Sequence, residues 1–205
     1  TRRSNGPPGR PQMTAGRPFN LLVVPDDEPP VLSGTFLEPR VRGLAETVTW
    51  HFDRPGNEEE TIARLKDAEA VINIRASVHF TRKVLAACPE LKVLSIWGTG
   101  VDHVDLPAAE ELGITVSNTP AYGAPYVSEH ALALALAVSR QIVTNDQQIR
   151  RGGWTRGFID ELYNKTLGVV GTGAIGRRMI QLGKGIGMQV IAWTLHPSPE
   201  RAAEY

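Results

Sequence analysis

The 205-residue sequence has few cysteines, no long apolar run and no excess of charge of one sign, and each of these absences excludes a class of protein. Its single cysteine, Cys88, excludes an internal disulfide and a cysteine-based zinc site. It has no run of about 18 consecutive apolar residues, which a membrane helix would need. It has no excess of charge of one sign, because 22 lysines and arginines balance 22 aspartates and glutamates, and this argues against a nucleic-acid-binding surface. We therefore expect a cytoplasmic globular protein that binds neither nucleic acid nor membrane.

The two ends of the sequence are unlike the rest. Residues 1–18 are mostly glycine, proline and arginine, and such a segment buries too little to offset the entropy of ordering, so we predict a disordered, solvated tail. It also lacks the apolar core of a signal peptide. At the other end, Ser198-Pro199-Glu200 is typical of a helix start, and the sequence stops after about two helical turns. We therefore expect the chain to be part of a larger gene product, with its true N-terminus undetermined.

From Phe19 onward, short β-branched, apolar segments alternate with helical patterns. The predicted strands are 19–24, 47–51, 70–74, 92–96, 114–117, 165–170 and 188–193. The predicted helices are 57–68, 82–87 after a Thr81 cap, a helix through Leu112 after an Asp105 cap, and one after the glycines at 171–176 that extends to about Gly185. Prolines obscure a further helix within 29–45. Strands that alternate with helices pair in parallel through right-handed crossovers, so an α/β fold is predicted.

The longest helical pattern spans residues 125–151. Its apolar stripe, with spacings of three and four, consists of Val127, Ala131, Leu134, Val138 and Ile142. A proline begins the segment and two glycines follow it. At about 1.5 Å per residue, one continuous helix would be roughly 40 Å long, which is enough to connect two domains.

A glycine motif carries the clearest chemical signal. Gly171-Thr172-Gly173-Ala174-Ile175-Gly176 directly follows a predicted strand and opens a predicted helix, which is the context that such a motif requires for dinucleotide binding. Gly171 permits the tight turn, Gly173 lets the backbone approach a pyrophosphate, and Gly176 lets the helix lie close to the strand. The N–H groups of Ala174, Ile175 and Gly176 begin the helix and, with its dipole, attract phosphate.

The sequence leaves the choice between NAD and NADP open. An acid about 20 residues beyond the motif would bind the ribose of NAD, but the next strand ends Trp193-Thr194-Leu195-His196 and no acid occurs before Glu200. No arginine directly follows that strand to bind the 2′-phosphate of NADP. Thr194 is able to donate to the ribose of either cofactor.

A longer segment resembles a known family. Residues 91–137 read LKVLSIWGTGVDHVDLPAAEELGITVSNTPAYGAPYVSEHALALALA. They contain a strand, a Gly-x-Gly-Val-Asp turn, a Gly-Ile-x-Val-x-Asn-Thr-Pro segment and a Ser-Glu-His-Ala helix, and the glycine motif follows at the expected distance. In this combination the sequence resembles the D-isomer-specific 2-hydroxyacid dehydrogenases, the family of phosphoglycerate, glycerate and D-lactate dehydrogenases. The resemblance covers residues 19–205.

The resemblance implies a domain organisation. It implies a flavodoxin-like parallel-sheet substrate domain over residues 19–120, followed over residues 121–205 by the first part of a Rossmann dinucleotide-binding domain. Helix 125–151 would connect the two. Family members transfer hydride between a nicotinamide cofactor, NAD or NADP, and C2 of a small 2-hydroxy or 2-oxo acid. They form homodimers through the nucleotide domain.

Four residues are expected to bind the substrate. Ligands bind beyond the carboxyl ends of parallel strands, where Arg75 and Ala76 follow one strand and Gly98 and Thr99 follow the next. The glycine turn exposes backbone N–H groups to a carboxylate, as the family uses it, and Arg75 would add a charged donor. A surface ion pair is the alternative for Arg75. Trp97, beside the turn, would pack either in the core or against substrate.

The family's catalytic set is expected beyond Tyr205. An arginine that polarises the 2-oxo group, a histidine that carries the proton and a glutamate that orients it belong to later parts of the nucleotide domain, so none is assigned here and the chain alone is expected to be inactive. Alternatives are a formate dehydrogenase-like enzyme and a non-catalytic NAD(H) sensor similar to the family's corepressors. An S-adenosylmethionine site is disfavoured by the upstream segments.

Other polar groups are not expected to be catalytic. Glu129 and His130 are adjacent on a helix, so their side chains diverge by about 100°. Asp102 and Asp105 fit turn and cap chemistry, and His103 lies on a turn, so no metal site is predicted. Cys88 is expected to be a small apolar side chain at a helix end.

Overall fold

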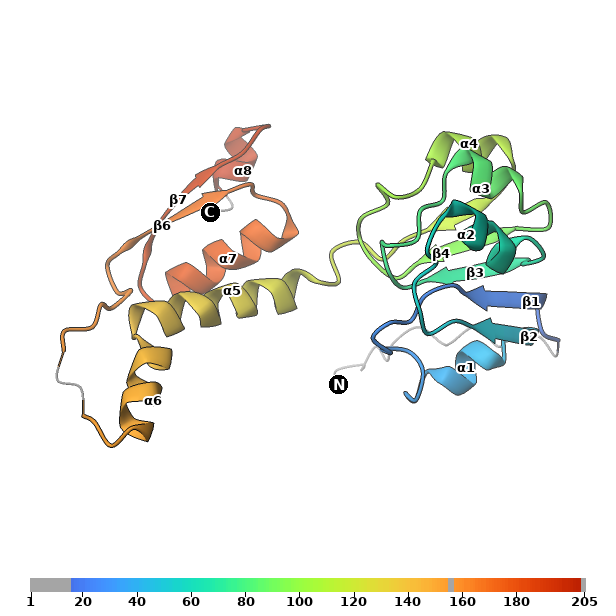
Figure 1. Ribbon diagram of the computed structural model, residues 1–205. Coiled ribbons are helices and arrows are strands. Elements are labelled where there is room, and N and C mark those ends of the chain that lie inside the picture. The colour runs from blue at the N-terminus through green and yellow to red at the C-terminus, as the bar shows by residue number, and fades with distance from the viewer. Residues whose placement is uncertain (1–15, 155–156, 204–205) are drawn as a thin grey trace, which may run out of the picture. The chain divides into compact units, whose positions relative to one another are not determined.

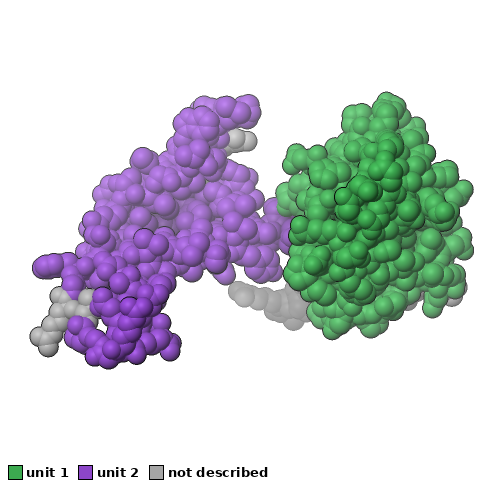
Figure 2. Space-filling model, viewed as in Figure 1, with its two compact units in different colours: residues 1–118 green, residues 119–205 purple. Residues whose placement is uncertain are grey.

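The computed structural model describes residues 16–154 and 157–203. The chain divides into two compact units, residues 1–118 and residues 119–205 (Figure 1, Figure 2). Of the tail predicted over residues 1–18, residues 1–15 lie outside the described part. Arg17 pairs with Glu46 at 3.2 Å. No described helix has the length and apolarity needed to cross a membrane.

The first unit is built on a five-stranded parallel sheet with the order β2-β1-β3-β4-β5. The strands are β1 (Phe19–Val24), β2 (Ala45–Trp50), β3 (Ala70–Asn73), β4 (Val93–Ile96) and β5 (Thr115–Ser117). This is the flavodoxin-like order, which reverses direction between β1 and β3. The predicted α/β fold with a parallel sheet is confirmed, and the first five strand predictions differ from the structure by at most two residues at either end.

Three helices pack on one face of this sheet, and one short helix packs on the other face beside β2 (Figure 1). They are α1 (Glu38–Arg42), α2 (Glu58–Leu65), α3 (Arg82–Ala86) and α4 (Leu106–Glu111). Because successive strand residues point to opposite faces, Val23 packs with Leu65 and Leu85 in one core, whereas Leu22 and Val24 pack in the other.

Helix caps follow from the sequence. The side chains of Asn57, Thr81 and Asp105 accept hydrogen bonds from the backbone N–H groups of Glu60, Val84 and Ala108, which satisfies donors at each helix start. The caps predicted at Thr81 and Asp105 are confirmed. The helix that the prolines obscured is α1, and it begins with a proline in its first turn.

The second unit contains a strand–helix–strand segment and two preceding helices. The elements are α5 (Ala124–Ser139), α6 (Ile142–Arg150), β6 (Thr166–Val170), α7 (Ala174–Gly185), β7 (Gln189–Trp193) and α8 (Pro199–Ala203). β6 and β7 pair in parallel. α7 lies close on them, since a Cβ added to Gly183 would lie 2.6 Å from the Leu167 side chain.

The single helix predicted over residues 125–151 is wrong. Two helices occupy this segment, and α6 turns away from the axis of α5 (Figure 1). Gln141 between them has a left-handed backbone, with φ of 50°. A left-handed residue cannot continue a right-handed helix, so α5 ends before Gln141 and α6 begins anew at Ile142. The Asn145 amide instead donates to the carbonyl of Arg140 at 3.2 Å, which satisfies an acceptor at the end of α5.

Candidate functional site

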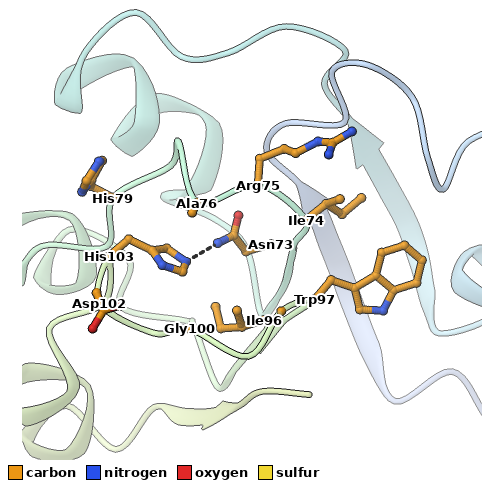
Figure 3. A pocket seen from close by; sticks show the side chains of 11 residues that line it. Asn73, Ile74, Arg75, Ala76, His79, Ile96, Trp97, Gly100, Asp102 and His103 are labelled. Atoms are coloured by element: carbon orange, nitrogen blue, oxygen red, sulfur yellow. Dashed lines mark hydrogen bonds between the residues drawn. The ribbon is translucent and has the colours of Figure 1, made fainter. Parts of the chain in front are cut away.

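A cavity of about 410 Å³ lies at the carboxyl ends of β3 and β4 (Figure 3). Ile74, Ile96 and Trp97 supply apolar walls, and the turns that follow the two strands supply the polar ones. The cavity lies next to the reversal of strand order between β1 and β3, where open parallel sheets bind their ligands.

Arg75 follows β3 and lines this cavity. Its guanidinium donates to the carbonyl oxygen of Pro29, in the loop after β1. Within residues 16–154 and 157–203, no carboxylate forms an ion pair with Arg75, so the surface ion pair considered as an alternative is not found there. Figure 3 shows the guanidinium pointing away from His103.

Asp26 joins the loop after β1 to the turn that begins at Arg75. It is fully buried, and its carboxylate accepts from the Ser77 hydroxyl at 2.6 Å and from the Glu28 N–H at 3.0 Å. The N–H of Val78 donates to the carbonyl of Arg75 at 3.3 Å and closes the turn. Asp26 therefore holds the turn that begins at Arg75, and the carbonyl of Pro29 holds the Arg75 side chain.

Three of the four residues predicted to bind substrate share the cavity wall. Arg75, Ala76 and Gly98 line it together with Gly100. Thr99 lies between the two glycines without lining the cavity itself, and its carbonyl accepts from the Asn118 amide at 2.8 Å. Trp97 packs against the core around Leu22, which is one of the two roles considered for it, and it also lines the cavity.

Asn73 and His103 also line the cavity, and the sequence patterns did not point to either of them as a site residue. Asn73 is 1% exposed, and its Nδ2 lies 2.7 Å from Nε2 of His103 (Figure 3). Burial lowers the pKa of His103, and the nearby His79 lowers it further, whereas Asp102 opposes this effect. The available signal was an asparagine at the end of an otherwise apolar strand.

The glycine motif forms a strand–turn–helix corner between β6 and α7, as predicted. Gly171 has a φ of 94°, which strongly favours glycine. A Cβ added to Gly176 would lie 1.9 Å from the carbonyl oxygen of Gly171, whereas one added to Gly173 would meet nothing within 4 Å. The corner thus combines three features. Its turn requires glycine at position 171, its helix lies close to that turn at Gly176, and the space in front of the helix start at Gly173 is open.

Among the described residues, the N-cap of α7 makes no side-chain hydrogen bond to the start of the helix. Gly173 is its N-cap and provides no side-chain cap, so Ala174, Ile175 and Gly176 present N–H groups of the first turn, which attract negative charge. The N–H of Gly171 donates to the carbonyl of Trp193 at 2.7 Å. This bond holds the end of β7, and hence Thr194, beside the corner.

The remaining polar candidates have structural explanations. Glu129 and His130 are both exposed on α5. Asp105 caps α4, and no group of three or more potential metal ligands occurs in the described part of the chain. Cys88 is buried, its thiol lies 3.2 Å from the carbonyl of Val84, and burial raises its pKa to about 11.

Comparisons with known proteins agree with this architecture. The chain matches the family model for the D-isomer specific 2-hydroxyacid dehydrogenase catalytic domain over residues 30–190. It is 36% identical over 179 residues to a D-3-phosphoglycerate dehydrogenase of Mycobacterium bovis, a match that covers 86% of this chain and 34% of that protein.

Solved structures of related proteins show the same fold. A D-lactate dehydrogenase from Aquifex aeolicus, complexed with NAD and lactic acid, is 26% identical with a TM-score of 0.72, covering 90% of this chain and 54% of that one. An acyclic imino acid reductase in complex with NADPH and D-Arg is 26% identical with a TM-score of 0.72, covering 87% of this chain and 58% of that one.

The parallel sheet and the glycine corner define an α/β protein of the class that binds ligands beyond the carboxyl ends of its strands. Within that class, the chain belongs to the D-isomer-specific 2-hydroxyacid dehydrogenase family. The resemblance recognised from the sequence motifs is thereby confirmed. The chain spans about a third of the length of the curated relatives it matches first.

Proposed function

We propose that this chain supplies the substrate-binding part and the first dinucleotide-binding part of an NAD(P)-dependent oxidoreductase. The reaction would interconvert a small D-2-hydroxy acid and its 2-oxo acid. The observation that carries the proposal is the corner at Gly171–Gly176, where the helix lies so close to the strand turn that no Cβ fits at Gly176.

The corner fits the pyrophosphate of a dinucleotide. The open space in front of Gly173 lets the phosphates approach the backbone, and the N–H groups of Ala174, Ile175 and Gly176 would donate to them. A bound nicotinamide would supply the hydride acceptor or donor. The two solved relatives are complexes with NAD and with NADPH, which supports either cofactor, and we propose that Thr194 donates to the ribose.

The cavity beside β3 and β4 fits a small carboxylate. We propose that Arg75 supplies the positive charge, and that the backbone N–H groups at Gly98 and Thr99, with the neighbouring Ala76, complete the carboxylate site. Among the described residues the Arg75 guanidinium has no ion-pair partner, and a charge-assisted bond from it to a substrate carboxylate would be strong. Its contact with Pro29 would hold the side chain in place before substrate arrives.

No residue of this chain is proposed to polarise the 2-oxo group or to transfer the proton. We therefore expect binding without appreciable turnover by the 205 residues alone, and turnover in the longer protein. We also propose a cytoplasmic homodimer, supported by apolar side chains of α5 such as Tyr126 and Val138, which are 69% and 77% exposed in a single chain.

Titration of the chain with NADH, NADPH and S-adenosylmethionine, followed through tryptophan fluorescence, tests the cofactor site. We expect NADH or NADPH to bind, and S-adenosylmethionine not to. Gly173→Val should weaken binding at least tenfold, because it fills the space in front of the helix start without forcing the backbone to move. Gly185→Ala, at an open position of the same helix, is the matched control and should bind as the original chain does. Equal binding by Gly173→Val and Gly185→Ala would contradict the proposal.

A further inference from the structure

Asn73 is a polar side chain in a place where an apolar one would suffice. It ends a strand whose other residues are Ala70, Val71 and Ile72, and it is 1% exposed. Burying an amide is costly unless it is hydrogen-bonded. Within the described part of the chain, its side-chain Nδ2 meets one partner, Nε2 of His103 at 2.7 Å, and its Oδ1 meets none. The buried amide of Asn73 is therefore placed to bind the His103 ring.

The His103 ring is held from several sides. Its backbone carbonyl accepts from the N–H of Phe80 at 2.8 Å. The ring of Phe80, which is fully buried, lies 6.2 Å from the His103 ring at an angle of 57°. With the Asn73 amide at Nε2, these contacts fix both the position and the rotation of a ring that lines the cavity. A rigid support of this kind is what a selective binding group requires.

The orientation of the Asn73 amide decides which ring nitrogen carries the proton. With Nδ2 of Asn73 facing the ring, as in this structure, Nε2 accepts, and in the neutral ring the proton then resides on Nδ1. Burial lowers the pKa of His103, which keeps the ring neutral at and above neutral pH. No described residue accepts from Nδ1, and Nδ1 is not among the buried unpartnered atoms. His103 therefore presents an accessible N–H donor.

We propose that His103, positioned by Asn73, is a specificity-determining residue that donates from Nδ1–H to an oxygen on the side chain of the substrate. The favoured ligands are 2-oxo or 2-hydroxy acids that carry a side-chain hydroxyl, over those with a plain alkyl group. A charged oxygen is disfavoured because the carboxylate of Asp102 lines the same cavity. This inference rests on the proposed carboxylate site at Arg75 and Gly98.

Binding of two probe acids tests the preference. The ¹⁵N-labelled chain is titrated at pH 8 with hydroxypyruvate and with pyruvate, and the dissociation constants are obtained from amide shifts. Hydroxypyruvate should bind about fivefold more tightly, because its hydroxyl accepts one neutral hydrogen bond that pyruvate cannot accept. His103→Phe should abolish this ratio and leave pyruvate binding within about twofold. His130→Phe, an exposed histidine on α5, is the matched control and should retain the ratio.

The tautomer gives a readout that does not depend on binding. Long-range ¹H–¹⁵N spectra should show the proton of His103 on Nδ1 in the original chain, and a mixture of tautomers in Asn73→Leu, a variant of similar shape. Asn73→Leu should also reduce the preference for hydroxypyruvate. A proton on Nε2 in the original chain, or an unchanged ratio in His103→Phe, would overturn the assignment of His103.

The two proposals fail in different ways. If neither acid shifts the resonances of the cavity residues, the proposed carboxylate site is wrong, and the inference about His103 falls with it. If both acids bind with equal affinity at the cavity, the carboxylate site stands and the specificity role of His103 is wrong.

Discussion

The hydroxyl of Ser77 donates a 2.6 Å hydrogen bond to the fully buried carboxylate of Asp26, 51 residues earlier in the chain. The bond joins the loop after β1 to the turn that carries Arg75. No described lysine or arginine forms an ion pair with Asp26, so hydrogen bonds alone stabilise the buried group. Both the stability of the unit and the position of Arg75 should depend on this contact.

We predict that Ser77→Ala lowers the free energy of unfolding of the first unit by about 1–3 kcal/mol, because it leaves a buried carboxylate oxygen without its donor. Amide hydrogen exchange of the residues in β1 and β3 measures this loss for the unit itself. Ser139→Ala is the control, since that hydroxyl makes only a local bond to the carbonyl of Leu136 on an exposed helix. Equal effects of the two substitutions would contradict the prediction.

The parts of the fold that follow from local pattern were predictable. β1 occupies the predicted residues 19–24, and the caps at Thr81 and Asp105 follow from short-range chemistry. The glycine corner was predictable for the same reason, because turn, close approach and helix start all lie within six residues. The position of Arg75 and Gly98 on the cavity wall was predictable because each lies two residues beyond the end of a strand.

What could not be predicted depends on long-range contacts. Asn73 and His103 are 30 residues apart, and only the parallel sheet brings them together. In the sequence each had a separate, ordinary explanation, as a strand residue and a turn residue. The end of α5 was missed because the apolar spacing continues past Gln141 into α6, so the pattern gives no sign of the left-handed residue between the two helices.

A second prediction concerns the close approach at the glycine corner. Gly176→Ala should destabilise the second unit by about 1–3 kcal/mol, as overpacking of a tight contact does, because the added methyl would lie 1.9 Å from the backbone oxygen of Gly171. Gly185→Ala in the same helix meets nothing within 4 Å and should be neutral or slightly stabilising. Hydrogen exchange of β6 and α7 compares the two variants. A Gly176→Ala chain as stable as Gly185→Ala would show that the helix does not need this approach.

A third prediction concerns the junction between α5 and α6. Gln141 has a φ of 50°, a conformation that costs a residue with a Cβ roughly 1–2 kcal/mol. Gln141→Gly should therefore stabilise the second unit, by up to about 1 kcal/mol after the greater entropy of glycine in the unfolded chain is subtracted. Arg140→Gly is the control, because Arg140 has a φ of −91° and gains nothing from glycine. Thermal unfolding should show opposite shifts, and a lower midpoint for Gln141→Gly would contradict a left-handed junction.

The last prediction is a dependence of stability on alkaline pH. Burial, with a contribution from the nearby charge of Asp67, raises the pKa of Cys88 from 9.0 to about 11. Below a pH of about 9 the thiol is protonated in both the folded and the unfolded chain. Between about 9 and 11 the unfolded chain loses this proton while the folded chain keeps it, so the unfolded state binds fewer protons and stability decreases as the pH rises.

Urea unfolding at pH 8 and pH 10 should show a larger loss of stability for the original chain than for Cys88→Ala, whatever stability the variant already loses at pH 8 from its smaller side chain. The same burial predicts that a thiol reagent reacts with Cys88 slowly in the folded chain and rapidly in urea. Equal losses of stability in the two chains between pH 8 and 10 would mean that the Cys88 thiol ionises as readily in the folded chain as in the unfolded one.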